Sequence, residues 1–208
     1  MILTDPVQFA HQLLAKAIRP GDIVIDATVG YGHDTHFLAE KVADFGHVYG
    51  FDLQESALDI CTDRLTKANL HQQVTLYNQG HERIITALAP DLKVQAAIFS
   101  LGILSAETAT QTTLPNTTIS AYHQILSRLN RGGLLVFVSE TQFNPSDEEI
   151  NYLVADLTHL NPDHYQVSRY QALITQVAKS SLSKKNKEQQ KIRFAKITLA
   201  NRIFCCYV

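Results

Sequence analysis

The sequence is poor in cysteine and has no long apolar run. It holds three cysteines, Cys61, Cys205 and Cys206, an odd number with two of them adjacent. This spacing is not that of a disulfide framework, and no cysteine–histidine spacing is typical of a zinc site, so we expect no metal. No apolar segment approaches the roughly 18 residues that a membrane-spanning helix requires. The first six residues lack the basic and apolar regions of a secretory signal, so we expect a cytoplasmic protein without membrane contact.

Positive charge is scarce over most of the chain and is concentrated near its end. Of the 208 residues, 45% are hydrophobic and 18% are charged, which is typical of one globular domain of this length. Residues 1–178 hold 10 Lys and Arg against 19 Asp and Glu, whereas residues 179–208 hold 8 against one. We therefore divide the chain into a domain at 1–178 and an atypical basic tail at 179–208. The lysine-rich run at 184–187 is either a solvated charge run or a segment that attracts a polyanion such as RNA.

Short apolar runs alternate with amphipathic stretches along the chain. The apolar runs predict buried strands at 23–25, 47–51, 74–77, 96–101, 134–138 and 165–174. The amphipathic stretches predict helices at 4–17, 34–42, 54–68, 82–88, 117–129 and 147–160. A turn is predicted at 130–133, where two glycines follow Asn and Arg. The alternation predicts an α/β fold with a mostly parallel sheet and helices on both faces, and such folds bind ligands at the carboxyl ends of the strands.

Acidic residues and glycines gather where the first two predicted strands end. Asp26 ends the first strand, and Gly30 and Gly32 follow it before a helix that we expect to begin near Asp34. Glycines let the backbone approach a ligand closely, and the amides of a helix N-terminus face such a ligand. Asp52 ends the second strand, where an acid can hold the ribose hydroxyls of a nucleoside cofactor.

The side chains of this loop favour one nucleoside cofactor over another. Thr35 occupies the position at which a dinucleotide-binding loop has its third glycine. Asp26 and Asp34 would repel a pyrophosphate, whereas they suit a ligand that carries an ammonium and a sulfonium. S-adenosylmethionine (SAM) has both groups and no phosphate, so we favour SAM over NAD. The alternatives are that the glycines form only a tight turn and that Asp34 only caps a helix.

Four segments in order carry a resemblance to a known family. Asp26–Thr35, Phe51–Gln54, Gly80–Glu82 and Leu101–Gly102 together resemble the YtqB-like family of small class I methyltransferases, and the resemblance covers residues 7–176. It implies a Rossmann-like fold of the seven-stranded type and SAM as the cofactor. It also implies tRNA as the partner, with N-methylation of 5-aminomethyl-2-thiouridine at the wobble position. The sequence leaves the oligomeric state open, with a homodimer as one alternative.

The resemblance assigns roles to individual residues. SAM contacts are implied for the loop after the first strand at Asp26, Gly30, Tyr31, Gly32, Asp34 and Thr35. Asp52 would bind the ribose, and Gln54 would lie near the adenosine. Gly80 and His81 would border the adenine and the reaction pocket. An amine acceptor must lose a proton to react, so His81, or alternatively Glu82, is the candidate catalytic proton acceptor. His81 could instead be a capping or loop histidine.

The chain departs from the family on the side of the methyl acceptor and at its end. The family usually has Asn and Tyr where this sequence has Ser100 and Ile103, the candidate substrate-binding residues. Two alternatives therefore stay open: methylation of another RNA or small molecule, and a SAM-binding protein without catalysis. The end of the chain also differs, and we interpret it as a replaced C-terminus, for instance after a change of reading frame. Either Phe194–Leu199 or Ile203–Val208 is then expected to substitute for the last strand of the sheet.

Overall fold

A computed structural model describes residues 6–101, 113–139, 148–171 and 202–207. Its strands are β1 (Ile23–Asp26), β2 (His47–Asp52), β3 (Val74–Asn78), β4 (Val94–Leu101), β5 (Leu129–Ser139), β6 (Gln166–Gln171) and β7 (Arg202–Tyr207). Its α-helices are α1 (Pro6–Ala17), α2 (His33–Val42), α3 (Glu55–Lys67), α4 (Ile84–Ala87), α5 (Pro115–Leu126) and α6 (Glu148–Leu157). Three short 3-10 helices complete the set: η1 (Ala43–Phe45), η2 (His71–Gln73) and η3 (His81–Arg83).

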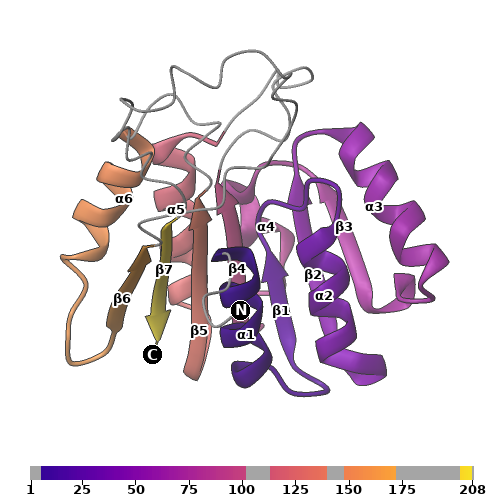
Figure 1. Ribbon diagram of the computed structural model, residues 1–208, viewed down its shortest axis with the longest axis horizontal. Coiled ribbons are helices and arrows are strands. Elements are labelled where there is room, and N and C mark those ends of the chain that lie inside the picture. The colour runs from indigo at the N-terminus through magenta and orange to yellow at the C-terminus, as the bar shows by residue number, and fades with distance from the viewer. Residues whose placement is uncertain (1–5, 102–112, 140–147, 172–201, 208) are drawn as a thin grey trace, which may run out of the picture.

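The strands form one sheet in the order β3-β2-β1-β4-β5-β7-β6 (Figure 1). The first five strands in this order are parallel, and β7 runs antiparallel to both of its neighbours. The predicted α/β fold with a mostly parallel sheet is therefore confirmed. The order reverses between β1 and β4, which is the place where open α/β sheets bind their ligands.

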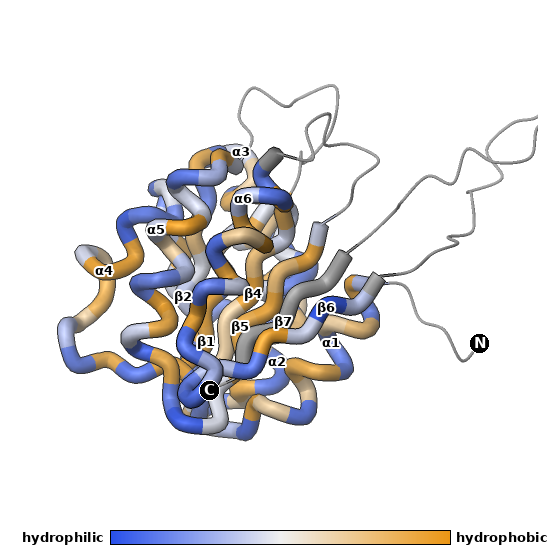
Figure 2. Tube along the Cα trace, turned by 90° about the vertical axis from the view of Figure 1, so that its left-hand side faces the viewer, coloured by the Kyte–Doolittle hydropathy of each residue, from blue (hydrophilic) through white to orange (hydrophobic). Residues whose placement is uncertain are grey.

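Helices cover both faces of the sheet, as the alternating pattern predicts. Apolar side chains of α1, α2 and α3 pack with Val24, Val48 and Ile98 on one face. Those of α4, α5 and α6 pack with Ile25 and Phe99 on the other. Apolar colours run along β4 and β5 in Figure 2, whereas hydrophilic and hydrophobic colours alternate along the helices. Strands that are buried on both faces need apolar residues throughout, and amphipathic helices need them on one side only.

The end of the chain contributes an interior strand. Residues 202–207 pair with β5 on one side and with β6 on the other. Of the two segments expected to substitute for the last strand, Ile203–Val208 overlaps β7, and Phe194–Leu199 lies outside the described residues. β7 thus covers the backbone edge of β5 that would otherwise be free to pair with another chain. The division at residue 178 and the origin of the C-terminal segment stay predictions.

Two local predictions differ from the structure. The turn expected at 130–133 lies inside β5, because α5 ends at Leu126 and the chain turns there. Gly132 takes φ 80°, and the register between β4 and β5 shifts at Val94/Ala96, so the two glycines form an irregularity within a strand. The helix expected at 82–88 is divided into η3 and the short α4. No helix within the described ranges is long and apolar enough to span a bilayer.

Candidate active site

A buried carboxylate at the end of β1 shapes the loop that follows it. Asp26 is fully buried and accepts hydrogen bonds from the Thr35 hydroxyl at 2.6 Å and from the Thr28 amide at 3.1 Å. Burial, and then the charge of Asp34, raise the pKa of Asp26 from 3.8 to about 7. These contacts connect the end of β1 to the first turn of α2. Asp26 therefore holds the two ends of the intervening loop together.

The second carboxylate links the loop to the neighbouring strand. Asp52 accepts hydrogen bonds from the Gly30 amide at 2.8 Å and from the Gln54 amide at 2.9 Å, one on each oxygen. An ionised carboxylate has about four lone-pair sites, so each oxygen of Asp52 retains an acceptor position. The side chain is half-buried at the carboxyl edge of β2. It is placed to receive two neighbouring hydroxyl groups.

The glycine loop is held from outside by α3. Arg64 donates from Nε to the Tyr31 carbonyl at 2.9 Å and from Nη2 to His33 at 3.1 Å. Gly32 takes φ 75° and precedes α2, and a Cβ built on it would lie 2.8 Å from the Cβ of Cys61. The loop therefore needs glycine at position 32 for two reasons, a left-handed backbone and a close contact with α3.

His81 presents a free nitrogen beside this loop. Its Nδ1 lies 3.1 Å from the Ala27 carbonyl oxygen. Because a carbonyl only accepts, Nδ1 carries a proton, and in the neutral ring Nε2 is then a lone-pair acceptor. Nε2 is buried and has no partner among the described residues. Burial lowers the pKa of His81 below 6.5, so the ring is neutral at neutral pH.

Glu82, the alternative proton acceptor, lies next to His81 and is less buried. Its carboxylate folds back over the Cα of Gly80, so a side chain at position 80 would require the Glu82 carboxylate to move. Both candidates thus lie in the segment that follows β3, but His81 is the one enclosed in the protein.

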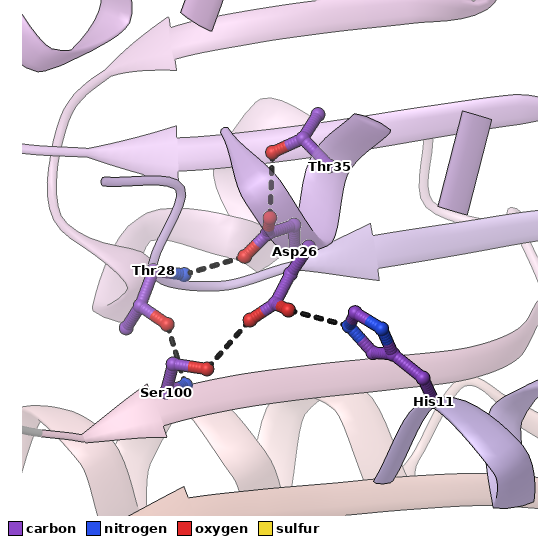
Figure 3. A network of polar contacts seen from close by, with 6 residues as sticks. His11, Asp26, Thr28, Thr35 and Ser100 are labelled. Atoms are coloured by element: carbon purple, nitrogen blue, oxygen red, sulfur yellow. Dashed lines mark hydrogen bonds and ion pairs between the residues drawn. The ribbon is translucent and has the colours of Figure 1, made fainter. Parts of the chain in front are cut away.

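Asp34 does not act as a helix cap. The N-cap position of α2 is Gly32, without a side-chain cap bond, and the two oxygens of Asp34 bond to residues outside the helix. Figure 3 shows these two partners, His11 and Ser100. One lies 2.7 Å from Nε2 of His11, and the other accepts from the Ser100 hydroxyl at 2.7 Å. The amide of Ser100 also donates to the Thr28 hydroxyl at 2.6 Å. The predicted residues Asp34 and Ser100, which are 66 positions apart in sequence, therefore meet at one point.

Sequence reasoning missed two residues of this site. They are His11 and Arg64, which no motif in the sequence singles out. Neither has a local signal, because each reaches the loop only through the packing of α1 or α3. Ile103 lies outside the described residues. Within the part of the chain that the structure describes, no group of three His, Cys, Asp or Glu side chains is arranged to hold a metal ion.

The family model described as "Putative rRNA methylase" matches residues 48–184, which is more than half of the chain. The chain belongs to this family. The match begins in β2 and includes the candidate residues at the ends of β2, β3 and β4.

Solved structures of two similar proteins extend the match over nearly the whole chain. One, from Clostridium thermocellum, is described as a "putative rRNA-methylase". It is 27% identical and has a TM-score of 0.80, and the match covers 99% of each chain. The other is a Streptococcus mutans methyltransferase solved with SAH; it is 27% identical, with a TM-score of 0.76 and coverage of 99% of this chain and 98% of that one. The fold is thus the Rossmann-like fold of class I methyltransferases, as the resemblance implied.

A curated relative is named for a defined tRNA reaction. It is the chloroplastic tRNA (mnm(5)s(2)U34)-methyltransferase of Arabidopsis thaliana, 31% identical over 139 residues, which are 63% of this chain and 51% of the relative. The chain spans about half the length of this relative, and a smaller part of a ribosomal RNA small subunit methyltransferase H from Oenococcus oeni.

Proposed function

We propose that the chain is a SAM-dependent methyltransferase that methylates the amine of 5-aminomethyl-2-thiouridine at the wobble position of tRNA. Membership of the family, the SAH-bound relative and the name of the Arabidopsis relative support this proposal. The structural observation that carries it is the buried Nε2 of His81, which has no partner in the described part of the chain and lies beside the loop that joins β1 to α2.

The residues present fit SAM. Asp52 keeps lone pairs free for the two ribose hydroxyls, and Gln54 follows it at the border of the adenosine. The loop at 30–35, with the acidic side chain of Asp34 at its end, suits the charged methionine part better than a phosphate. When bound, SAM supplies an electrophilic methyl group on a sulfonium. The protein's part is to align the acceptor with that methyl group and to keep water out.

His81 has the properties of the proton acceptor that an amine substrate requires. An alkyl amine is mostly protonated at neutral pH and must lose a proton before its lone pair can attack. A neutral imidazole can take this proton when its Nδ1–H is held by the Ala27 carbonyl and its Nε2 lone pair meets no donor among the described residues. Ser100, near the end of β4, would contact the amine as well. Ile103 is proposed, from its place in the sequence, to contact the base.

Methyl transfer tests the proposal directly. Isotope-labelled SAM is mixed with tRNA that carries 5-aminomethyl-2-thiouridine, and the nucleosides are analysed by mass spectrometry. The matched control is the same tRNA without the aminomethyl group. We expect one added methyl group on the modified nucleoside only. Transfer to both tRNAs, or to another RNA, would select the alternative substrate, which the change from Asn to Ser100 keeps open. SAM binding without any transfer would select a binding protein.

A further inference from the structure

Three elements that are distant in sequence meet at the carboxylate of Asp34. His11 reaches it from α1, and Ser100 reaches it from the carboxyl end of β4 (Figure 3). Both distances are 2.7 Å, and the side chains of His11 and Asp34 are 23% and 10% exposed. Short contacts to a poorly solvated carboxylate are the stronger kind of hydrogen bond, so this arrangement is well defined.

The arrangement determines which way the Ser100 hydroxyl points. A carboxylate only accepts, so the Ser100 Oγ–H donates to Asp34. The Ser100 amide is also committed, because it donates to the Thr28 hydroxyl. The hydroxyl oxygen also has two acceptor positions, and no donor to them is found among the described residues. Ser100 is half-buried at the carboxyl edge of β4, the edge where ligands bind in this fold.

We propose that His11 is a positioning residue for methyl transfer, which rests on the proposed function. By holding Asp34 on one oxygen, His11 keeps the other oxygen in place to take the Ser100 proton. The Ser100 oxygen is then available to accept an N–H of the substrate amine. An amine held in this way would keep its lone pair available for the methyl group that bound SAM would supply. A ligand with a hydrogen-bond donor, such as an amine, fits this oxygen, whereas one with only acceptors does not.

The surroundings of His11 offer a pair of variants that separate bonding from packing. Its ring lies parallel to that of Phe37, with centroids 3.9 Å apart. His11→Phe keeps a ring on Phe37 and removes the bond to Asp34. His11→Gln places an amide N–H close to the position of Nε2 and removes the ring. A role in packing alone predicts that Phe is the better replacement, and the positioning role predicts that Gln is.

A second histidine–aspartate pair on the other side of the sheet supplies the control. His123 lies 2.8 Å from Asp156, and its ring is stacked on Tyr122 at 4.3 Å. His123→Phe therefore removes the same kind of contact and keeps the same kind of stacking. The contact between His123 and Asp156 joins α5 to α6, away from the loop after β1.

The experiment measures three quantities in the full chain: kcat, KM for tRNA and the Kd of SAM. They are compared between wild type and the variants His11→Phe, His11→Gln, Ser100→Ala, the double variant His11→Phe/Ser100→Ala and the control His123→Phe. We expect His11→Phe to lower kcat about tenfold or more, with the Kd of SAM unchanged within about twofold. His11→Gln should recover most of this loss, and His123→Phe should have no effect. In the double variant, His11→Phe should add little to the loss caused by Ser100→Ala, because both act through one hydroxyl.

Other outcomes would overturn the inference. An unchanged kcat in His11→Phe, or losses that multiply fully in the double variant, would show that His11 does not act through Ser100, with the proposed function intact. A fall in SAM affinity that parallels the fall in kcat would show a role in the loop's structure instead. If wild-type protein binds SAM and methylates no tRNA, the proposed function fails first and this inference with it.

Discussion

The amide of Gly30 donates to Oδ2 of Asp52 over 2.8 Å, so the loop after β1 is fastened to the end of β2. The same carboxylate caps its own turn through the Gln54 amide. One side chain thus joins the two strand ends between which a nucleoside cofactor is proposed to lie. Its charge and its place both matter, because a neutral amide in its position offers a single acceptor oxygen.

Asp52→Asn is therefore expected to weaken SAM binding. The variant retains the size of the side chain, but it loses the charge and one of the two acceptor oxygens. Losing hydrogen bonds to a charged group costs about 1.5–3 kcal/mol, which corresponds to a rise in Kd of roughly tenfold or more. Titration calorimetry with SAM or S-adenosylhomocysteine measures it. Asp59→Asn, an exposed acid on α3, is the control. Equal affinities of the two variants would remove Asp52 from the cofactor site.

His81→Asn tests the proton acceptor. Asparagine reaches about as far as Nδ1, so it can keep the bond to the Ala27 carbonyl while lacking the Nε2 lone pair. Loss of a general base lowers the rate of a proton-dependent step by about 10²–10⁴-fold. Single-turnover transfer with SAM and tRNA in excess of their Kd should show this loss, with cofactor affinity preserved. The exposed His159→Asn serves as control. A variant that transfers methyl groups at the wild-type rate would leave Glu82 or desolvation alone to explain the chemistry.

The burial of Asp26 predicts a pH dependence of stability. Its pKa rises from 3.8 in the unfolded chain to about 7 in the fold, so between these values the folded state holds a proton that the unfolded state has released. The contribution of this proton is fully present below pH 3.8 and is lost as the pH rises through about 7. The free energy of unfolding should fall with pH in this window by at most about 1.4 kcal/mol per pH unit.

Comparison with Asp26→Asn isolates this contribution. The substitution removes the titrating group, and the other ionisable residues are shared by the two proteins and cancel in the difference. Urea unfolding across the window should show wild type losing stability relative to the variant as the pH rises. A difference that is constant with pH would mean that Asp26 is ionised throughout and that its burial is offset by its hydrogen bonds from Thr35 and Thr28.

The sequence predicts the fold well and the site only in part, for a physical reason. Strand and helix periodicity is local, so β1, β2, α2 and α3 appear within one or two residues of their predicted limits. The residues at the strand ends, such as Asp52, are also predictable, because parallel strands bring their carboxyl ends to one edge. His11 and Arg64 are different, since their roles come from where a helix packs on a distant loop. Residues 130–133 were expected to form a turn and instead belong to an irregular strand. This difference also depends on pairing with β4, which a local sequence pattern cannot predict.

Two glycines allow the cost of backbone strain to be measured apart from the cost of crowding. Gly32 lies in the proposed cofactor loop, whereas Gly21 precedes β1. Gly32 takes φ 75° and Gly21 takes φ 94°, both in the left-handed region. A Cβ at position 21 would meet nothing within 4 Å, whereas one at position 32 would press on the side chain and backbone of Cys61. Gly21→Ala should thus cost only the backbone strain, about 1–2 kcal/mol. Gly32→Ala should cost roughly 1–3 kcal/mol more through overpacking, and it should also weaken SAM binding because the loop must move.

Chemical denaturation of both variants measures the two costs, and replacement of Cys61 distinguishes their causes. Cys61→Gly in the Gly32→Ala background clears the sulfur and the Cβ but leaves the Cα, which is 3.1 Å from the added methyl group. It should therefore recover part of the lost SAM affinity, although it adds a glycine to α3 at a cost of about 1 kcal/mol in stability. If Gly32→Ala and Gly21→Ala are equally stable and both bind SAM normally, then α3 yields to the added methyl group. The close packing of Gly32 on Cys61 would then not be what sets the shape of the loop.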